Sequence, residues 1–181
     1  MSPRPDARKR CKWPGNPLAI AYHDKEWGVP VHNDRKLFEF LILEGAQAGL
    51  SWDTILAKRE NYRDALHGFD FMKISKYTAK DKRRLLENPG IVRNRAKIDA
   101  TIVNARGVVA LRKEYGSFSR YVWGFARMDA KAGAEALSKD LKKRGFNFVG
   151  PTIMYAFMQA TGMVNDHEKA CFRWRELNAK N

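Results

Sequence analysis

The chain has 181 residues, 44% of them hydrophobic and 12% aromatic, a composition that supports a folded core and excludes a largely disordered protein. It contains no run of 18 apolar residues and no apolar segment near its start, which argues against a membrane span and a secretory signal, so we expect a cytoplasmic protein with no membrane partner. The net charge of +14 makes DNA or RNA the expected partner, with a merely solubilising surface as the alternative.

Three segments account for all of the net positive charge: residues 1–12, 73–97 and 139–147. The first ten residues contain two prolines and five charged side chains, which predicts a flexible basic extension over residues 1–10. No repeat or low-complexity linker follows. We therefore expect one folded domain over residues 11–175 and a short tail over residues 176–181.

Apolar residues recur at helical spacing through most of the chain, and no segment shows the alternation typical of a strand. Asp34 is the candidate N-cap of a helix that ends near Ala48. Pro89 and Gly90 interrupt the pattern, and a longer helix is expected over residues 91–111. The remaining expected helices begin after Ser51, Asp70 and Thr78 or span about 118–126, 134–144 and 151–161. The sequence therefore predicts an all-α fold.

Each of the two cysteines lies near a histidine at one end of the sequence: Cys11 and His23 near the start, His167 and Cys171 near the end. On a helix, His167 and Cys171 would project from one face about one turn apart, so both could bind one ion. Zinc takes four tetrahedral ligands from thiolate and imidazole groups, and a Cys2His2 set would join the two ends of the chain. The alternative is two unrelated thiols and a histidine that is hydrogen-bonded within the fold.

Glu44 lies within one helical turn of Leu41 and Ile42, so part of its surroundings should be apolar. A buried carboxylate needs a partner, or its pKa is raised. One candidate partner is a cationic or hydrogen-donating ligand, such as a base stacked on Trp27 or Trp52. The alternative is a core of tryptophans in which Glu44 binds a backbone amide or a lysine.

Pro89 and Gly90 form a tight turn between two expected helices, and three basic side chains follow at Arg93, Arg95 and Lys97. Such a hairpin exposes backbone N–H groups at the start of the second helix, beside the positive charges. This combination suits an anion such as a DNA phosphate. An ordinary connector between helices is the alternative.

Taken together, these segments resemble the bacterial 3-methyladenine DNA glycosylases of type I, a family of the helix-hairpin-helix glycosylase superfamily. The resemblance extends from Arg10 to about Phe172, and its most specific stretches stand in this order: AYHDKEWGVP, LEGAQAGLSW, KRENYR, ALSKDLKKRGFNFVGPTI, and MVNDH followed by Cys171. It implies a single glycosylase domain over residues 11–175 with an all-α, helix-hairpin-helix glycosylase-like fold. It also implies that one structural Zn2+ joins the N- and C-terminal segments, held by Cys11, His23, His167 and Cys171.

The activity that this resemblance implies is base-excision repair of double-stranded alkylated DNA. A monomeric, monofunctional glycosylase would flip 3-methyladenine out of the duplex, hydrolyse its bond to the sugar and leave an abasic site, with free 3-methyladenine as the product. Glu44, the implied catalytic residue, would bind the edge of the base together with Tyr22, while Trp52 stacks on its face. Trp13 and Trp27 would line or brace the pocket.

The resemblance implies DNA contacts as well. Leu50, beside Gly49 at the tip of the Ala-Gly-Leu-Ser turn, resembles an apolar wedge that fills the gap left in the duplex. The phosphate-binding residues would lie in the hairpin and at the start of the following helix: Pro89, Gly90, Arg93, Arg95 and Lys97.

The sequence also departs from the wider superfamily in two places. Val92 stands where many helix-hairpin-helix proteins have a second glycine, and no convincing water-activating aspartate occurs between Thr101 and Gly124. Two other functions stay open: a non-enzymatic DNA-binding module stabilised by zinc, and a zinc hydrolase. The second needs an open three-ligand site such as His-Glu-x-x-His, whereas Cys171 stands three residues after Glu168.

Overall fold

The computed structural model describes residues 8–179, and over that range it contains helices and no β-strand, so the all-α prediction is confirmed. No helix in this range combines the length and the apolar character that a membrane span requires. The α-helices and the two 3-10 helices (η) are, in chain order: α1 Pro17–Lys25, α2 Asp34–Gln47, α3 Trp52–Ala65, η1 His67–Phe69, α4 Phe71–Ile74, α5 Ala79–Glu87, α6 Arg95–Tyr115, α7 Phe118–Trp123, η2 Phe125–Arg127, α8 Ala130–Lys143, α9 Pro151–Ala160 and α10 Phe172–Asn178.

Three predicted N-caps are confirmed: Ser51 for α3, Asp70 for α4 and Thr78 for α5. The prediction for α2 was wrong by one residue. Asn33 caps this helix, with its side-chain oxygen accepting a hydrogen bond from the backbone N–H of Lys36 (3.0 Å). The Asp34 carboxylate instead accepts from the backbone N–H of Ser119 (2.8 Å) and pairs with Arg112 (3.0 Å), so tertiary contacts decide between two adjacent residues that both favour the cap.

Two other helices begin four residues away from their predicted starts. Helix α6 begins later, at Arg95, because residues 91–94 belong to the hairpin and Asn94 supplies the cap. Helix α8 begins earlier, at Ala130, where the Asp129 carboxylate accepts from two backbone N–H groups. In both cases a short polar side chain sets a boundary that apolar periodicity alone does not locate.

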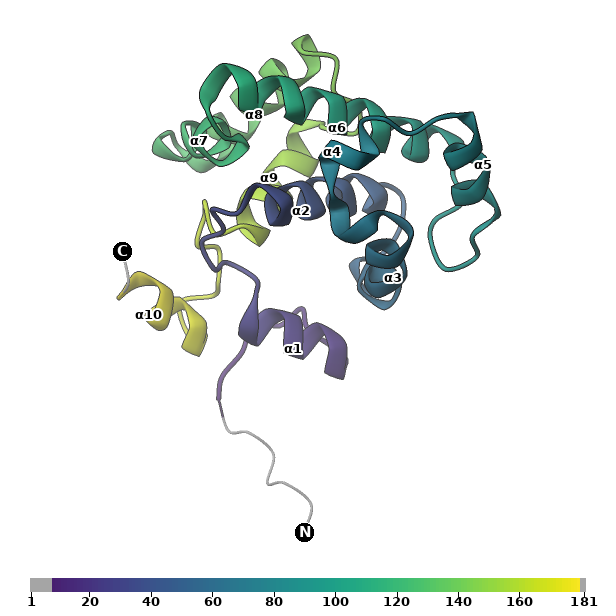
Figure 1. Ribbon diagram of the computed structural model, residues 1–181. Helices are drawn as coiled ribbons and strands as arrows, with labels where there is room; N and C mark the ends of the chain where they lie inside the picture. Colours follow the sequence, from purple (N-terminus) through teal and green to yellow (C-terminus); the bar gives the residue numbers. More distant parts are fainter. Residues whose placement is uncertain (1–7, 180–181) are drawn as a thin grey trace.

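Helix α2 lies at the centre of the larger lobe. Every residue from Leu37 to Ala46 is buried, and Figure 1 shows helices α3 to α9 arranged around it. Its contacts include α3, α6, α7 and α9. A helix that is buried all round holds its polar residues in apolar surroundings, and this arrangement places the carboxyl groups of Glu39 and Glu44 inside the protein.

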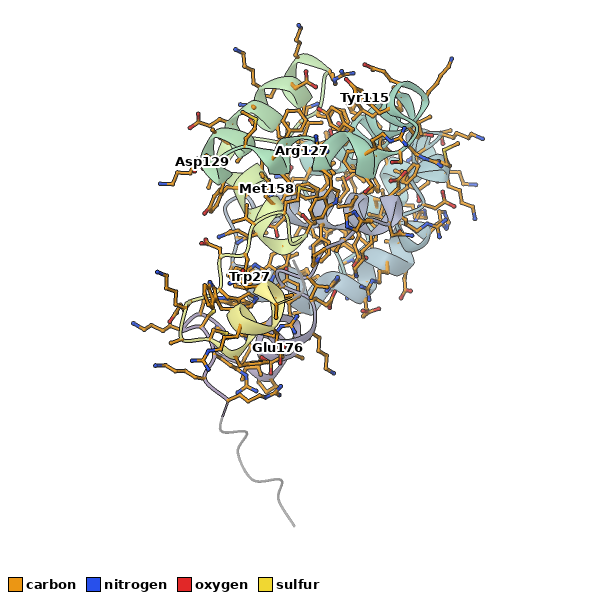
Figure 2. The ribbon with its side chains drawn as sticks, turned by 90° about the vertical axis from the view of Figure 1, so that its left-hand side faces the viewer. Trp27, Tyr115, Arg127, Asp129, Met158 and Glu176 are labelled. Atoms are coloured by element: carbon orange, nitrogen blue, oxygen red, sulfur yellow. The ribbon has the colours of Figure 1, made fainter. Side chains whose placement is uncertain are left out.

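The two ends of the chain together form a smaller lobe. Figures 1 and 2 both show α1 and α10 on the same side of the larger lobe, and α1 contacts α3. The backbone N–H of Phe172 donates to the carbonyl of Lys9 (2.9 Å), and the Arg10 guanidinium pairs with Asp24 (2.7 Å). Both ends of the described chain are therefore part of one folded unit.

These contacts correct the predicted domain boundaries. Residues 8–10, which the sequence assigned to a flexible extension, belong to the smaller lobe, and residues 1–7 of that extension lie outside the described part of the chain. At the other end, α10 continues to Asn178 and buries Leu177, so the fold extends beyond residue 175. The sequence predicted no helix here, because the seven residues of α10 give too short an apolar pattern to be recognised.

Candidate functional site

A cavity of about 390 Å³ lies where the two lobes meet, near Trp27, which Figure 2 shows at that level. The segments near the chain ends and the larger lobe both line it: Cys11, Trp13, Tyr22, Trp27, Asp166 and Glu168 from the former, and Glu44, Gln47, Trp52, Ala156 and Gln159 from the latter. The cavity has the size and the mixed aromatic and polar lining of a small-molecule site. The structure thus brings together all five residues that the sequence proposed for binding a base.

Glu44 is buried, with 4% of its surface exposed, and it makes no hydrogen bond or ion pair with any residue in the described part of the chain. The alternative of a backbone amide or lysine partner is therefore not observed. Burial raises the pKa of Glu44 from its ordinary value of 4.5 to about 8. An unpartnered carboxyl group in the wall of a cavity is suited to a ligand that carries positive charge or donates hydrogen bonds.

Two further polar groups in the same wall lack a partner among the described residues: the hydroxyl of Tyr22 and the indole N–H of Trp52. Their rings lie 5.3 Å apart between centroids, and burial, followed by the charge of Glu44, raises the pKa of Tyr22, so its hydroxyl stays protonated. An unsatisfied buried polar group typically costs about 1–3 kcal/mol. The cavity therefore leaves unmade the hydrogen bonds that a bound molecule can supply.

Beside Tyr22 lies a buried ion-pair network that the sequence reasoning missed. Arg59, 6% exposed, donates to Glu39 (2.7 Å) and to both carboxylate oxygens of Glu26 (3.0 and 2.8 Å). Its guanidinium carbon lies 5.9 Å from the centre of the Tyr22 ring. The three charged residues come from α3, α2 and the end of α1, so no local spacing relates them. The network fixes α1, and with it Tyr22, against the larger lobe.

The cavity also has polar lining residues that were not predicted. Gln159 donates to Asp166 (2.6 Å), and Tyr155, which lies four residues before Gln159 on α9, donates to the same carboxylate oxygen (3.2 Å). Gln47 lies one turn after Glu44 on α2. Gln47 could have been predicted as a lining residue, because it lies on the same helical face as Glu44. The partners of Asp166 could not, because they depend on how α9 packs.

The four predicted metal ligands converge. The ligand atoms of Cys11, His23, His167 and Cys171 all lie within 4.8 Å of one another, and all four residues are buried. Three of the four sulfur–nitrogen distances are 3.5, 3.5 and 3.6 Å. A tetrahedral zinc ion with ordinary bond lengths separates a sulfur and a nitrogen ligand by about 3.6 Å, so this donor set fits the ion.

Hydrogen bonds outside the cluster fix both histidines in the form that binds a metal. The Nε2 of His167 lies 3.0 Å from the carbonyl of Trp27, which can only accept, so Nε2 carries the proton and Nδ1 faces the sulfurs with its lone pair. Likewise, Nδ1 of His23 donates to Asp24 (2.8 Å) and leaves Nε2 free for the cluster. Burial lowers the pKa of His167 to about 4, which keeps the ring neutral. Carbonyl and carboxylate partners of this kind orient histidine ligands at metal sites.

The local structure around Cys171 differs from the prediction. Helix α10 begins only at Phe172, so His167 and Cys171 do not share a helical face. A turn closed by the bond from the backbone N–H of Cys171 to the carbonyl of Glu168 (2.7 Å) brings the two side chains together instead. On the other side, Gly28 has φ +78°, and a side chain there would approach His167 to 3.0 Å.

The segment after α2 presents Leu50 to solvent. Residues 47–50 form a type II turn, with Ala48 at φ −47°, ψ 116°, Gly49 at φ +76°, and a hydrogen bond from the N–H of Leu50 to the carbonyl of Gln47 (2.6 Å). Gly49 suits the third position, because only glycine adopts that φ at no steric cost. Leu50 is 41% exposed at the tip, where the sequence placed an apolar wedge.

The hairpin around Pro89 and Gly90 is present, but its backbone N–H groups are less available than the sequence suggested. The N–H of Gly90 donates to the side chain of Asn88 (2.8 Å), and that of Val92 donates to the hydroxyl of Tyr62 (3.2 Å). A phosphate would have to displace these partners. The hairpin therefore offers an anion chiefly the side chains and the helix start that follow it.

The three basic residues after the hairpin do not behave alike. Arg93 and Arg95 are exposed. Lys97 is half-buried, and its ammonium donates to the carbonyls of Ala46 (2.8 Å) and Ala48 (2.7 Å). A phosphate at Lys97 would have to compete with both carbonyls.

Comparison with protein families gives a match over nearly the whole chain. The family model described as methyladenine glycosylase matches residues 12–174. Among curated proteins, the chain is 47% identical over 178 residues to DNA-3-methyladenine glycosylase 1 of Escherichia coli (strain K12), which covers 90% of this chain and 95% of the relative.

Solved structures of similar sequence share the fold. A crystal structure of 3-methyladenine DNA glycosylase I (TAG) has 50% sequence identity and a TM-score of 0.86, over 91% of this chain and 98% of that chain. A structure from Staphylococcus aureus, described as the structural basis of 3-methyladenine recognition by 3-methyladenine DNA glycosylase I (TAG), has 36% identity and a TM-score of 0.86, over 92% and 97% of the two chains. The arrangement of helices described above is thus the one that these enzymes share.

Proposed function

Because the chain belongs to the methyladenine glycosylase family, we propose that it is a base-excision repair glycosylase that hydrolyses 3-methyladenine from alkylated DNA and leaves an abasic site. One observation carries this assignment at the level of the site. The Glu44 carboxyl group lies in a cavity wall beside the Tyr22 hydroxyl and the Trp52 N–H, and none of the three has a partner within residues 8–179. Methylation at N3 gives adenine a positive charge, which this wall complements and which normal adenine lacks.

In the proposed reaction, the protein flips the alkylated base out of the duplex into the cavity. Glu44 and Tyr22 bind the edge of the base, Trp52 stacks on its face, and Trp13 and Trp27 complete the aromatic wall. The cationic base is already a good leaving group, so a strong general acid is unnecessary. Water then captures the sugar cation as the bond breaks. Among the described residues, no lysine lines the cavity, which supports a monofunctional enzyme.

We also propose that Cys11, His23, His167 and Cys171 hold one structural zinc ion. Four protein ligands complete a tetrahedral shell, so the ion would supply cross-linking and no open position for water. It would clamp the two chain ends that form one side of the cavity. The zinc hydrolase alternative lacks the open site that it requires.

For DNA binding, we propose that Leu50 enters the duplex where the base has left, while Gly49 allows the sharp turn that carries it. Arg93 and Arg95, next to the hairpin tip at Pro89 and Gly90, would bind backbone phosphates. Leu50 directly follows α2, the helix that carries Glu44, and the hairpin leads into α6, which packs against α2.

The direct test is to incubate the protein with methylated duplex DNA and to separate the released bases by chromatography. We expect 3-methyladenine and an intact strand with abasic sites. Binding to the DNA without release of any base would instead support the non-enzymatic DNA-binding module. Unmodified duplex of the same sequence is the control.

The pH dependence of the reaction should report the ionisation of Glu44. Its pKa in the free protein is about 8, and the charge of the lesion does not depend on pH, so kcat/KM should fall by about tenfold for each pH unit below 8. The Glu44→Gln variant should lose this dependence, because its amide does not titrate. A flat wild-type profile between pH 6 and 9 would contradict a role for the carboxylate.

Salt dependence should separate phosphate contacts from base recognition. Removing two phosphate ligands in Arg93→Ala/Arg95→Ala should reduce the slope of log affinity against log salt by about 2 for duplex DNA. Binding of free 3-methyladenine should stay unchanged. The matched control is Lys142→Ala/Lys143→Ala on α8, which removes the same charge from another surface. An equal loss of slope in the control would show that the contribution is one of net charge alone.

A further inference from the structure

Lys97 forms a link between the helix after the hairpin and the turn that carries Leu50. It lies in the first turn of α6, and its ammonium donates to the carbonyls of Ala46 (2.8 Å) and Ala48 (2.7 Å) at the end of α2. The contact joins residues 49 positions or more apart in the chain. No carboxylate within the described residues forms an ion pair with Lys97. Its ammonium group is therefore hydrogen-bonded to the two carbonyls alone in this part of the chain.

The first of these carbonyls belongs to the last turn of α2. The final four carbonyl groups of a helix have no partner within the helix, and a cation near them is also favoured by the helix dipole. The Ala46 carbonyl is one of these four. Lys97 thus acts as a cap supplied from another helix.

The second carbonyl determines the type of the turn. In a type II turn over residues 47–50, the peptide between Ala48 and Gly49 has the orientation given by ψ 116° at Ala48 and φ +76° at Gly49. In a type I turn, this peptide plane is rotated by about 180°, and its carbonyl points to the opposite side. The ammonium of Lys97 can therefore bind the Ala48 carbonyl only in the type II form.

From these contacts we infer that Lys97 is a positioning residue for the DNA wedge: by holding the Ala48–Gly49 peptide in one orientation, it fixes the turn that presents Leu50 to the duplex. This inference rests on the proposed function, since it takes Leu50 to be the wedge. Burial lowers the pKa of Lys97, as expected for an ammonium group that is half-buried among backbone dipoles. Because Lys97 begins the helix that follows the hairpin, the same side chain connects the phosphate-binding segment with the wedge.

The test compares Lys97→Met, which keeps the length of the side chain and removes the ammonium group, with the wild type under single-turnover conditions. We expect release of 3-methyladenine from duplex DNA to fall about tenfold, the effect of one charge-assisted hydrogen bond. Release from an alkylated single strand, which leaves no gap to fill, should change less than twofold. Lys113→Met, at the far end of α6 and exposed, is the matched control and should behave as the wild type.

A double-mutant cycle with Leu50→Ala tests whether Lys97 acts through the wedge. If it does, the variant with both substitutions should release base from duplex no more slowly than Leu50→Ala alone, within twofold. Additive losses, or a reduced salt slope in Lys97→Met, would show that Lys97 is a phosphate ligand after all and would overturn the inference.

Two measurements keep these outcomes interpretable. The affinity of Lys97→Met for free 3-methyladenine, monitored by tryptophan fluorescence, should equal that of the wild type. This result would show that the cavity is intact. If this variant does not fold, Lys97→Leu, which also lacks a donor, gives the same comparison. A wild-type protein that releases no base would refute the proposed function itself, whereas equal duplex release by the wild type and Lys97→Met would refute only the inference.

Discussion

Replacing Glu44 by glutamine should slow release of 3-methyladenine from duplex DNA by about 10²- to 10³-fold at pH 9, where the carboxyl group is ionised; this is the effect of removing one pre-positioned group that stabilises charge in a buried site. Glu44 is 4% exposed and has no competing partner among the residues described, so its carboxyl group is available to a bound cation. The amide keeps the volume of the side chain and leaves the cavity intact. The measurement is single-turnover release, together with the affinity for free 3-methyladenine, which should also fall.

The control for this variant is Glu135→Gln on α8, an exposed carboxylate whose loss should change neither quantity. Equal kinetics for Glu44→Gln and the wild type would remove Glu44 from the site. A loss of activity accompanied by a loss of helical content would indicate damage to the fold instead.

The same substitution, although it lowers activity, should raise the free energy of unfolding. The pKa of Glu44 is about 8 in the folded protein against an ordinary value of 4.5, so between these values the unfolded chain has released a proton that the folded protein retains. The wild-type free energy of unfolding therefore falls as pH rises from about 4.5 to 8 and is level above. Glutamine does not titrate, so the stability of the variant relative to the wild type should grow by up to about 4 kcal/mol between pH 5 and pH 9. Denaturant unfolding at both pH values measures this difference.

Loss of the metal site should have the second large effect. Cys171→Ser should lose stoichiometric zinc, measured by elemental analysis, and about 4–5 kcal/mol of unfolding free energy, by analogy with the closing of a long loop by a disulfide. For a chain of this size that corresponds to a fall in Tm of about 10–15 °C. The wall that we propose to bind the base is formed partly by the segments that the ion would clamp, so activity should fail only as the protein unfolds.

The matched variant for this test is Cys11→Ser, the thiol from the other end of the chain. It should show the same losses, and the variant with both substitutions should lose little more, because one missing ligand already opens the site. Zinc retained in full by either variant would contradict the assignment. Activity abolished at full stability would mean that the ion takes part in the reaction.

The sequence predicted the helices well where a local signal marks their ends. Ser51, Asp70 and Thr78 begin helices because each has a side-chain oxygen that satisfies a free N–H group in the first turn. The prediction from the sequence failed where the start of a helix depends on contacts with another element. The choice between Asn33 and Asp34 rests on contacts with Ser119 and Arg112, which lie more than 70 residues away in the chain.

The candidate site was predicted in its residues more than in its geometry. His167 and Cys171 were selected on the assumption of a shared helix, and a turn achieves the same convergence. The buried Arg59 network could not be predicted, because its partners come from three elements with no fixed spacing. The role of Lys97 was also hidden: a basic residue beside a hairpin suggests phosphate binding, and only the packing of α6 against α2 shows that its ammonium is occupied.

The convergence of the two chain ends bears on when the protein becomes active during its synthesis. Residues 11–28 leave the ribosome well before Asp166 and Glu168, which line the same cavity, and before His167 and Cys171, the candidate metal ligands that lie beside Cys11 and His23. The buried core of the larger lobe is built mainly from residues of α2 to α9, which lie between these two segments in the sequence. A nascent polypeptide from which residues 166–171 have yet to emerge therefore lacks part of the cavity wall and two of the four candidate metal ligands.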